Sequence, residues 1–191
     1  MGRRVAIVGA VFAVVVASAV GWLIARGMPY GANPASHPVA ASAPAVPAPT
    51  GRKIKARLFY VAEDGIQLTS VERDVAYGEG PEEQAREIIA AQIAPVLEPL
   101  VSAIPAGTTL RAVFITKTGD AYVDLSGEAR TAHPGGTVDE LLTVYTIVNA
   151  RTVNLPAVTA VQVLVDGKEV DTLSGHVDLR RPLAKNLAWV Q

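Results

Sequence analysis

The sequence runs Ile104-Pro105-Ala106, two short apolar segments and then Leu125-Ser126-Gly127, and the same order returns about 50 residues later. The second occurrence runs Leu155-Pro156-Ala157, two apolar segments and Leu173-Ser174-Gly175. Self-similarity at a fixed period of this size indicates that one supersecondary unit is used more than once. We therefore predict two related units between residues 80 and 175.

An amphipathic helix is predicted at the start of each unit. The first begins at Gly80-Pro81-Glu82-Glu83, where proline suits the first helical turn and the acids face the positive end of the helix dipole. Its apolar stripe contains one polar residue, Gln92. The second begins at Thr137-Val138-Asp139-Glu140, which fits a capping box. Its apolar face has helical spacing: Leu141, Val144, Tyr145 and Val148.

Three β-hairpins are predicted, at residues 53–75, 110–125 and 161–173. Each range holds two apolar or alternating segments around a turn signal, such as Glu63-Asp64-Gly65 or Asp166-Gly167. The predicted fold class is therefore α+β. It consists of two helix-plus-β-hairpin pseudo-repeats with an N-terminal β-hairpin, and its mainly antiparallel sheet is covered by two helices.

Residues 1–26 are predicted to be a transmembrane anchor. Residues 5–24 are 20 consecutive uncharged positions, about 30 Å of helix, which matches the hydrocarbon thickness of a bilayer. Arg3 and Arg4 precede the run and only Arg26 follows closely, so the positive-inside rule places the N-terminus in the cytoplasm. The alternative is a signal peptide, whose cleavage pattern would be Ala17-Ser18-Ala19. Either version exports the rest of the chain.

The chain is predicted to continue as a linker and then a folded domain. Residues 27–50 contain no charged residue, 6 Pro and 7 Ala, which is typical of an extended linker. Residues 51–191 are long enough for one hydrophobic core. The predicted localisation is the cell membrane, with a single pass and with residues 51–191 in the periplasm or another extracytoplasmic space.

Composition excludes several classes of function. The sequence has no Cys, which excludes disulfides, thiolate zinc sites, cysteine nucleophiles and a lipid anchor on cysteine. Residues 51–191 carry 14 basic and 18 acidic residues, a net charge of −4. A nucleic-acid-binding surface needs the opposite bias, so we expect no nucleic-acid partner.

No active site is evident in the sequence. Ser174, His176 and Asp178 would lie about 7 Å apart on one side of an extended segment, whereas a catalytic triad requires hydrogen-bond contact. Metal-ligand spacings and phosphate-binding loops are also absent from the sequence, so we expect no enzyme, metal site or cofactor. Asn149 and Asn154 are expected to face solvent or cap a helix end. The candidate interaction or motif residues are Asp124, Glu128, Glu140, Asn149, Gln162, Ser174, His176 and Asp178.

An ordered set of short strings resembles the sporulation and spore-germination GerMN domain over roughly residues 54–183. The strings are Ser102-Ala103-Ile104-Pro105-Ala106-Gly107-Thr108, Tyr122-Val123-Asp124-Leu125-Ser126-Gly127-Glu128, Gly135-Gly136, Ile147-Val148-Asn149, Val161-Gln162-Val163-Leu164-Val165-Asp166-Gly167 and Leu173-Ser174-Gly175-His176-Val177-Asp178-Leu179. The resemblance implies an exported, membrane-attached envelope protein without enzymatic activity. In spore formers it implies a ring-building module that assembles with partners between two membranes.

The chain differs from the best-known members of that family in two ways. It lacks the lipid-modified cysteine, so residues 5–24 would attach it to the membrane, and it has one such domain rather than two. We predict a membrane-tethered extracytoplasmic assembly module that binds an envelope protein or itself through a sheet edge or uncovered sheet face. The alternative is a cell-wall- or ligand-binding sensor that holds peptidoglycan through Asp124, Glu128 and His176. A wall hydrolase with His176 as general base is less favoured.

Overall fold

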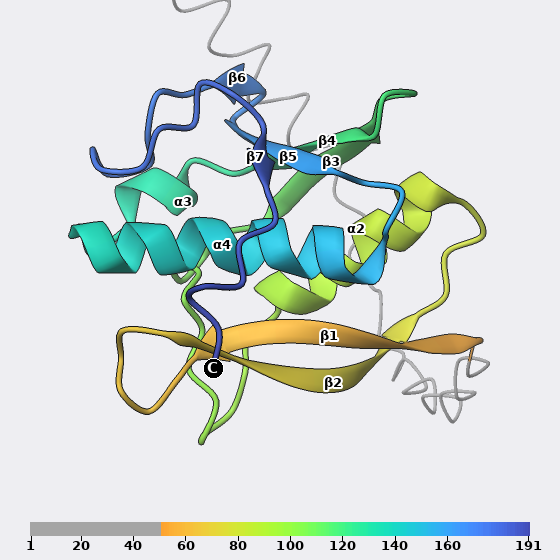
Figure 1. Cartoon of the computed structure of the whole chain (residues 1–191), viewed down its shortest axis with the longest axis horizontal. Helices are drawn as coiled ribbons and strands as arrows, with labels where there is room; N and C mark the ends of the chain where they lie inside the picture. Colours follow the sequence, from red (N-terminus) through yellow and green to blue (C-terminus); the bar gives the residue numbers. More distant parts are fainter. Residues whose placement is uncertain (1–50) are drawn as a thin grey trace, which may run out of the picture. The chain divides into compact units, whose positions relative to one another are not determined.

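The computed structural model describes residues 51–191, and this part of the chain has the predicted α+β class. The notation follows Figure 1. The strands are β1 (Lys53–Val61), β2 (Leu68–Ala76), β3 (Leu110–Ile115), β4 (Asp120–Leu125), β5 (Ala160–Val165), β6 (Lys168–Glu169) and β7 (Leu183–Ala184). The helices are α2 (Pro81–Ile93), α3 (Glu128–Thr131) and α4 (Thr137–Asn154). The predicted anchor and linker lie outside the described residues.

The strands form two separate sheets. β1 and β2 pair antiparallel with Ile54 opposite Val75, as the first hairpin predicts. The second sheet has the order β3-β4-β5-β6, and β7 also pairs with β5. Within it β3 and β4 form the predicted antiparallel hairpin, but β4 and β5 are parallel, with Val123 opposite Val163. A parallel pair requires a crossover connection, and α3 and α4 provide it.

The third hairpin is shorter than predicted. Asp166 and Gly167 form its turn with φ of 52° and 75°, and β6 ends at Glu169 instead of continuing to residue 173. The backbone N–H of Leu173 donates to the carboxylate of Glu140 on α4 rather than to β5. Because the Glu140 carboxylate of α4 accepts this N–H, Leu173 is not paired with β5.

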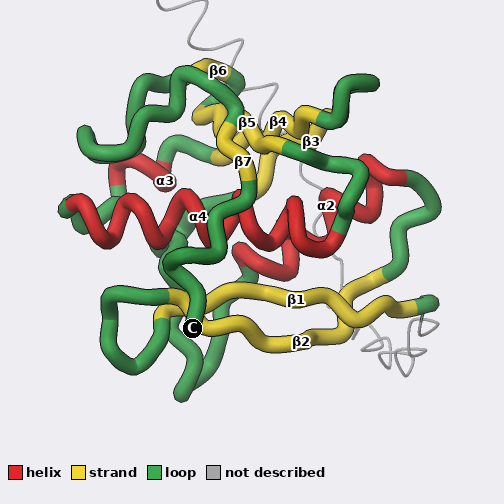
Figure 2. Tube along the Cα trace, in the orientation of Figure 1, coloured by secondary structure: helices red, strands yellow, loops and turns green. Residues whose placement is uncertain are grey.

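The helices lie in a layer between the two sheets (Figures 1 and 2). α4 packs against β1 of one sheet, β5 of the other and α2 beside it. This arrangement differs from the prediction of one sheet covered on one face, because β1 and β2 lie on the opposite side of α4 from β4 and β5. With both sides covered, 11 of the 18 residues of α4 are buried.

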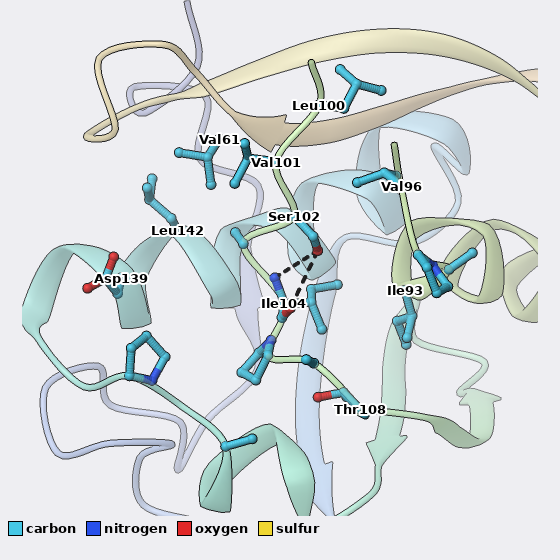
Figure 3. Close-up of a pocket in the computed structure, with 18 of the residues that line it drawn as sticks. Val61, Ile93, Val96, Leu100, Val101, Ser102, Ile104, Thr108, Asp139 and Leu142 are labelled. Carbon is cyan, nitrogen blue, oxygen red and sulfur yellow. Dashed lines mark hydrogen bonds between the residues drawn. The ribbon is translucent and has the colours of Figure 1, made fainter. Parts of the chain in front are cut away.

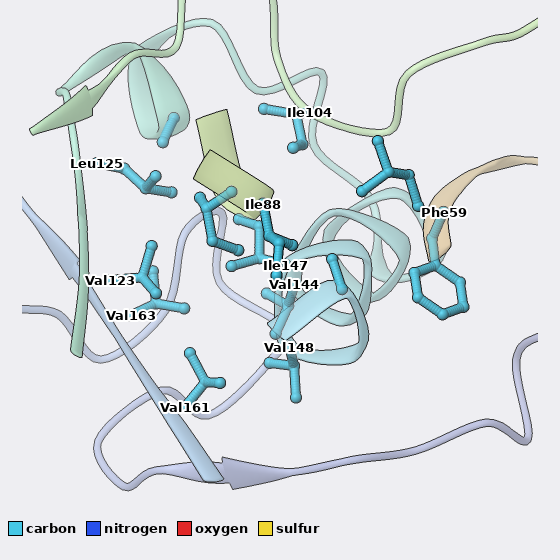
Figure 4. Packing of buried hydrophobic residues seen from close by; sticks show 14 of the residues in the cluster. Phe59, Ile88, Ile104, Val123, Leu125, Val144, Ile147, Val148, Val161 and Val163 are labelled. Carbon is cyan, nitrogen blue, oxygen red and sulfur yellow. The ribbon is translucent and has the colours of Figure 1, made fainter. Parts of the chain in front are cut away.

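The core lies between the helices and the mixed sheet (Figure 4). Val123 and Val163 project from β4 and β5 toward Ile88 on α2 and Ile147 on α4, and all four are at most 1% exposed. Burying such a side chain stabilises the fold by about 1.5–3 kcal/mol. On the other side of α4, Leu58, Phe59 and Tyr60 of β1 are all buried.

Side-chain amides close the free edge of β1. Gln92 of α2 accepts the N–H of Phe59 at 2.8 Å and donates to its carbonyl at 2.7 Å. Asn154, the last residue of α4, makes the same two contacts with Arg57, both at 2.8 Å. The N–H of Val61 donates to the carbonyl of Val101 at 2.9 Å. An edge whose polar groups are occupied in this way cannot add another strand there.

Candidate functional site

Glu140 lies in the first turn of α4, and its side chain is fully buried. The predicted capping box is wrong. The residue that caps α4 is Gly136, without a side-chain hydrogen bond, and the Glu140 carboxylate points away from the helix start toward residues 173–176. Burial of an ionised carboxylate is unfavourable unless donors surround it, and that loop supplies them.

Five hydrogen-bond contacts surround the Glu140 carboxylate. The N–H groups of Leu173, Ser174 and His176 donate to it at 2.7, 3.0 and 2.7 Å, and the Ser174 hydroxyl donates at 2.9 Å. Nδ1 of His176 lies 3.2 Å from Oε2. Burial raises the pKa of Glu140, but the backbone and hydroxyl donors outweigh it and lower the pKa to about 2. The carboxylate is therefore ionised and fastens the loop to α4.

This cluster joins three of the residues singled out in the sequence: Glu140, Ser174 and His176. Its geometry is not that of a triad, because the serine hydroxyl and the histidine ring both face the same carboxylate. Asp178, which an extended segment would place beside them, instead forms a bidentate pair with exposed Arg180 at 2.9 and 2.7 Å. The cluster holds the loop in place and offers no nucleophile with its own base.

The other candidate residues do not form one site. Asp124 accepts from Arg111 at 3.1 Å and from the N–H of Gly167 at 2.8 Å. Exposed Glu128 begins α3, and the Ser126 hydroxyl lowers its pKa. The amide group of buried Gln162 donates to the carbonyl of Leu179. Each of these contacts holds a separate loop in place. Within residues 51–191, no group of three His, Asp or Glu side chains could hold a metal ion.

The environment of Asn149 differs from the one predicted from the sequence. Its side chain is fully buried rather than solvated, and its amide bonds the backbone N–H and carbonyl of Asn186 at 3.0 and 2.8 Å. The sequence signal was an amide within an apolar helix, which a buried backbone segment can occupy as a partner. Asn149 thus fixes the C-terminal segment to α4.

An apolar groove of about 890 Å³ lies beside α2 (Figure 3). Val61 and Val101 lie near Leu142 of α4 on one side, and Ile93 and Val96 lie on the other. Asp139 is the one charged residue that lines it. Leu97 and Val101 on the segment that follows α2 are 88% and 55% exposed. Exposed apolar surface at a groove is typical of an interaction site.

Sequence reasoning did not identify this groove. Part of its lining comes from residues 94–101, a segment with Pro95 and Pro99 in which the sequence predicted no site. The available signal was the combination of two prolines with Val96, Leu97, Leu100 and Val101. Apolar residues in a segment that cannot continue as helix or strand are available to a partner.

A partly buried hydrogen-bond network lies next to the groove. The N–H of Gly135 donates to Nδ1 of His133 at 3.0 Å, and Nε2 of the ring lies 3.2 Å from Oγ1 of Thr143. The Thr143 hydroxyl donates to the carbonyl of Ala103 at 2.6 Å. Because a backbone N–H can only donate, Nδ1 must be the acceptor and Nε2 carries the proton. Burial lowers the pKa of His133.

Arg151 of α4 is fully buried, and none of its three side-chain nitrogens has a hydrogen-bond partner among the described residues. Burial lowers its pKa from 12.5 to about 10, so it stays charged at neutral pH. We expect Arg151→Met to raise the free energy of unfolding by about 1 kcal/mol, because a hydrophobic side chain of similar length removes an unpaired buried charge. Urea denaturation measures this, with exposed Arg57→Met as the neutral control. A loss of stability in Arg151→Met would contradict it.

A family profile described as Germane, sporulation and spore germination, matches residues 57–171. The chain belongs to this family. The match confirms the resemblance found in the sequence. A tandem pair of GerMN domains of the sporulation protein GerM from Bacillus subtilis is similar in fold, with a TM-score of 0.54 and 18% identity. The match covers 70% of this chain and 46% of that one, so the chain spans about half the length of the pair.

Two other solved structures are similar to this GerMN-family chain, and each match covers 70% of it. A Clostridium perfringens protein described as a lipoprotein has 26% identity and a TM-score of 0.49 over 88% of its own length. The first GerMN domain of Bacillus subtilis GerM has 19% identity and a TM-score of 0.48 over 96% of its length. No curated protein matches the sequence.

Within residues 51–191, none of the helices combines the length and the apolar character needed to cross a bilayer. The predicted span, residues 5–24, lies outside this range.

Proposed function

We propose that this chain is a membrane-tethered protein of the cell envelope whose GerMN domain binds a partner protein outside the membrane. The apolar groove beside α2 carries the proposal. Membership of the sporulation and germination family and the uncharged run at residues 5–24 support it. In this proposal residues 5–24 span the membrane once, with the N-terminus in the cytoplasm.

The sequence analysis predicted docking at a sheet edge or an uncovered sheet face, but the groove is a better docking surface than the edge of β1. Gln92, Asn154 and Val101 occupy the backbone groups of β1 from Arg57 to Val61. The groove, in contrast, leaves Val101 and the neighbouring Leu97 exposed. A partner that covers them gains about 25 cal/mol for each Å² of apolar surface removed from water.

The lining of the groove defines the chemistry of the partner. Apart from Asp139 it consists of apolar residues, small residues and hydroxyl side chains. An apolar segment of another envelope protein, with a lysine or arginine at the end that meets Asp139, complements both features. A second copy of this chain is the competing occupant.

Photo-crosslinking in intact cells tests this function. The full chain would carry a photoreactive amino acid at Leu97, and at Ile66 in the control, because Ile66 is 57% exposed and lies in the turn between β1 and β2. We expect Leu97 alone to capture an envelope protein, through a peptide that is apolar with a basic end. Equal capture from both positions would contradict the proposal, and capture of a second copy would replace the partner by self-association.

A charge in the groove is expected to weaken that capture. Val101→Asp should reduce the cross-link from Leu97 at least about tenfold, because an unpaired carboxylate would be desolvated against the apolar partner. Ile66→Asp should leave it unchanged. The cross-link yield at equal expression measures both effects, and an unaltered yield in Val101→Asp would contradict docking in the groove.

A further inference from the structure

We propose that His133 is a pH-sensitive latch on one wall of the groove, which holds that wall in place when the ring is neutral and releases it when the ring is protonated. The inference rests on the proposed docking function and adds its regulation. It is carried by the hydrogen bonds around the ring and by the position of the loop they hold.

The ring connects two walls of the groove. Ala132 and Pro134, on either side of His133, line one wall, and Ala103 lines another. The chain of contacts runs from the Gly135 N–H to Nδ1, from Nε2 to Oγ1 of Thr143, and from that hydroxyl to the carbonyl of Ala103. Neutral His133 satisfies every donor and acceptor in this chain.

A second proton on His133 breaks this arrangement. It must bind Nδ1, where the Gly135 N–H already points, and two donors then face each other. The Gly135 contact is lost, and the loop has a hinge beside it: Gly135 and Gly136 have φ of 86° and 88°, a region that glycine enters freely. Released Gly135 can therefore move with Pro134, and one wall of the groove moves with it.

Charged groups around the ring act in both directions. Burial favours the neutral ring and lowers the pKa of His133. The carboxylates of Glu140 and Asp139 raise this pKa, and His176, in the loop beyond β6, lowers it. The pKa of His133 in the folded chain therefore lies below 6.5, the ordinary value. The stability of the latched loop is complete above pH 6.5 and declines as the pH falls below it.

Glu140 does not act as a free counter-ion for His133. Its carboxylate already accepts from Leu173, Ser174 and His176. Nδ1 of His176 also lies 3.2 Å from Oε2 of this carboxylate. The two histidines therefore contact different groups, so variants at each position can separate their effects.

NMR of the full chain in detergent micelles, labelled at histidine nitrogens and at Val and Leu methyl groups, tests the latch. The sequence has three histidines, so His→Gln variants assign each ring. At pH 7.5 we expect the Nε2–H tautomer for His133 and a protected Gly135 amide. Between pH 7.5 and 5, the exchange of that amide should accelerate at least about tenfold, and the methyl signals of Val101 and Leu142 should shift with the midpoint of His133.

The matched variant is His133→Gln, whose amide can accept from Gly135 and donate to Thr143 but does not titrate. It should keep the groove signals constant between pH 7.5 and 5, whereas His176→Gln should retain the change. An Nδ1–H tautomer, or groove signals that ignore the titration of His133, would overturn the latch. Capture from Leu97 at pH 7.5 with no such response would overturn the latch alone, and a response without capture would overturn the docking function alone.

Discussion

Glu140→Ala is expected to lower the free energy of unfolding by about 3 kcal/mol. The substitution leaves the N–H groups of Leu173, Ser174 and His176 without their acceptor, and each lost hydrogen bond costs about 1 kcal/mol. A carboxyl pKa that falls from 4.5 to about 2 on folding corresponds to a contribution of the same size. Urea denaturation of the full chain at pH 7 measures the loss.

The neighbouring residue supplies the control. Asp139 lies in the same first turn of α4 but is exposed, so Asp139→Ala should lose only the favourable interaction with the helix dipole, about 0.3–1 kcal/mol. Equal losses of stability in the two variants would show that the Glu140 carboxylate acts through the helix dipole and not through its hydrogen bonds to residues 173–176.

The pH dependence of stability has a definite sign at Glu140. Its folded-state pKa is about 2 and the ordinary value is 4.5. The contribution is therefore complete above pH 4.5 and is lost as the pH falls toward 2. In Glu140→Gln, which has no charge at that position, stability should change less between pH 4.5 and 2 than in the wild type.

Local patterns predicted the elements of the fold, and long-range contacts decided their arrangement. Hydrophobic spacing located α2, α4 and the first two hairpins within a few residues. The sequence did not predict that β4 and β5 are parallel, since adjacent hairpins and a crossover give the same local pattern. Nor did it predict two sheets, because both sides of a buried helix read as one wide apolar face.

The candidate site shows the same division. Residue type singled out Glu140, Ser174 and His176, but only the folded chain shows that a residue on α4 meets a loop more than 30 positions later. The capping-box pattern at Thr137–Glu140 gave the wrong partner because a backbone N–H at the helix start and the N–H groups of residues 173–176 compete as donors for one carboxylate. The groove was missed because it is formed by segments far apart in the sequence, such as Val61 and Leu142.

A polar residue on an apolar stripe was the one sequence signal for the closed edge of β1. Gln92 is fully buried and bonds both backbone groups of Phe59. Gln92→Met keeps the length of the side chain but leaves a buried N–H and a buried carbonyl unpaired. Each unpaired group costs about 1–3 kcal/mol, so we expect a loss of about 3 kcal/mol in the free energy of unfolding, measured by urea denaturation.

Asn154 makes the same pair of contacts where water can replace it, which isolates the effect of burial. Its partner Arg57 is exposed, so Asn154→Ala should cost about 1 kcal/mol or less. Hydrogen exchange adds a second readout, because the Phe59 amide should lose protection in Gln92→Met while the Arg57 amide changes little in Asn154→Ala. Equal losses of stability in the two variants would contradict this prediction. They would show that burial of the Phe59 backbone groups does not make the Gln92 contact stronger than the Asn154 contact.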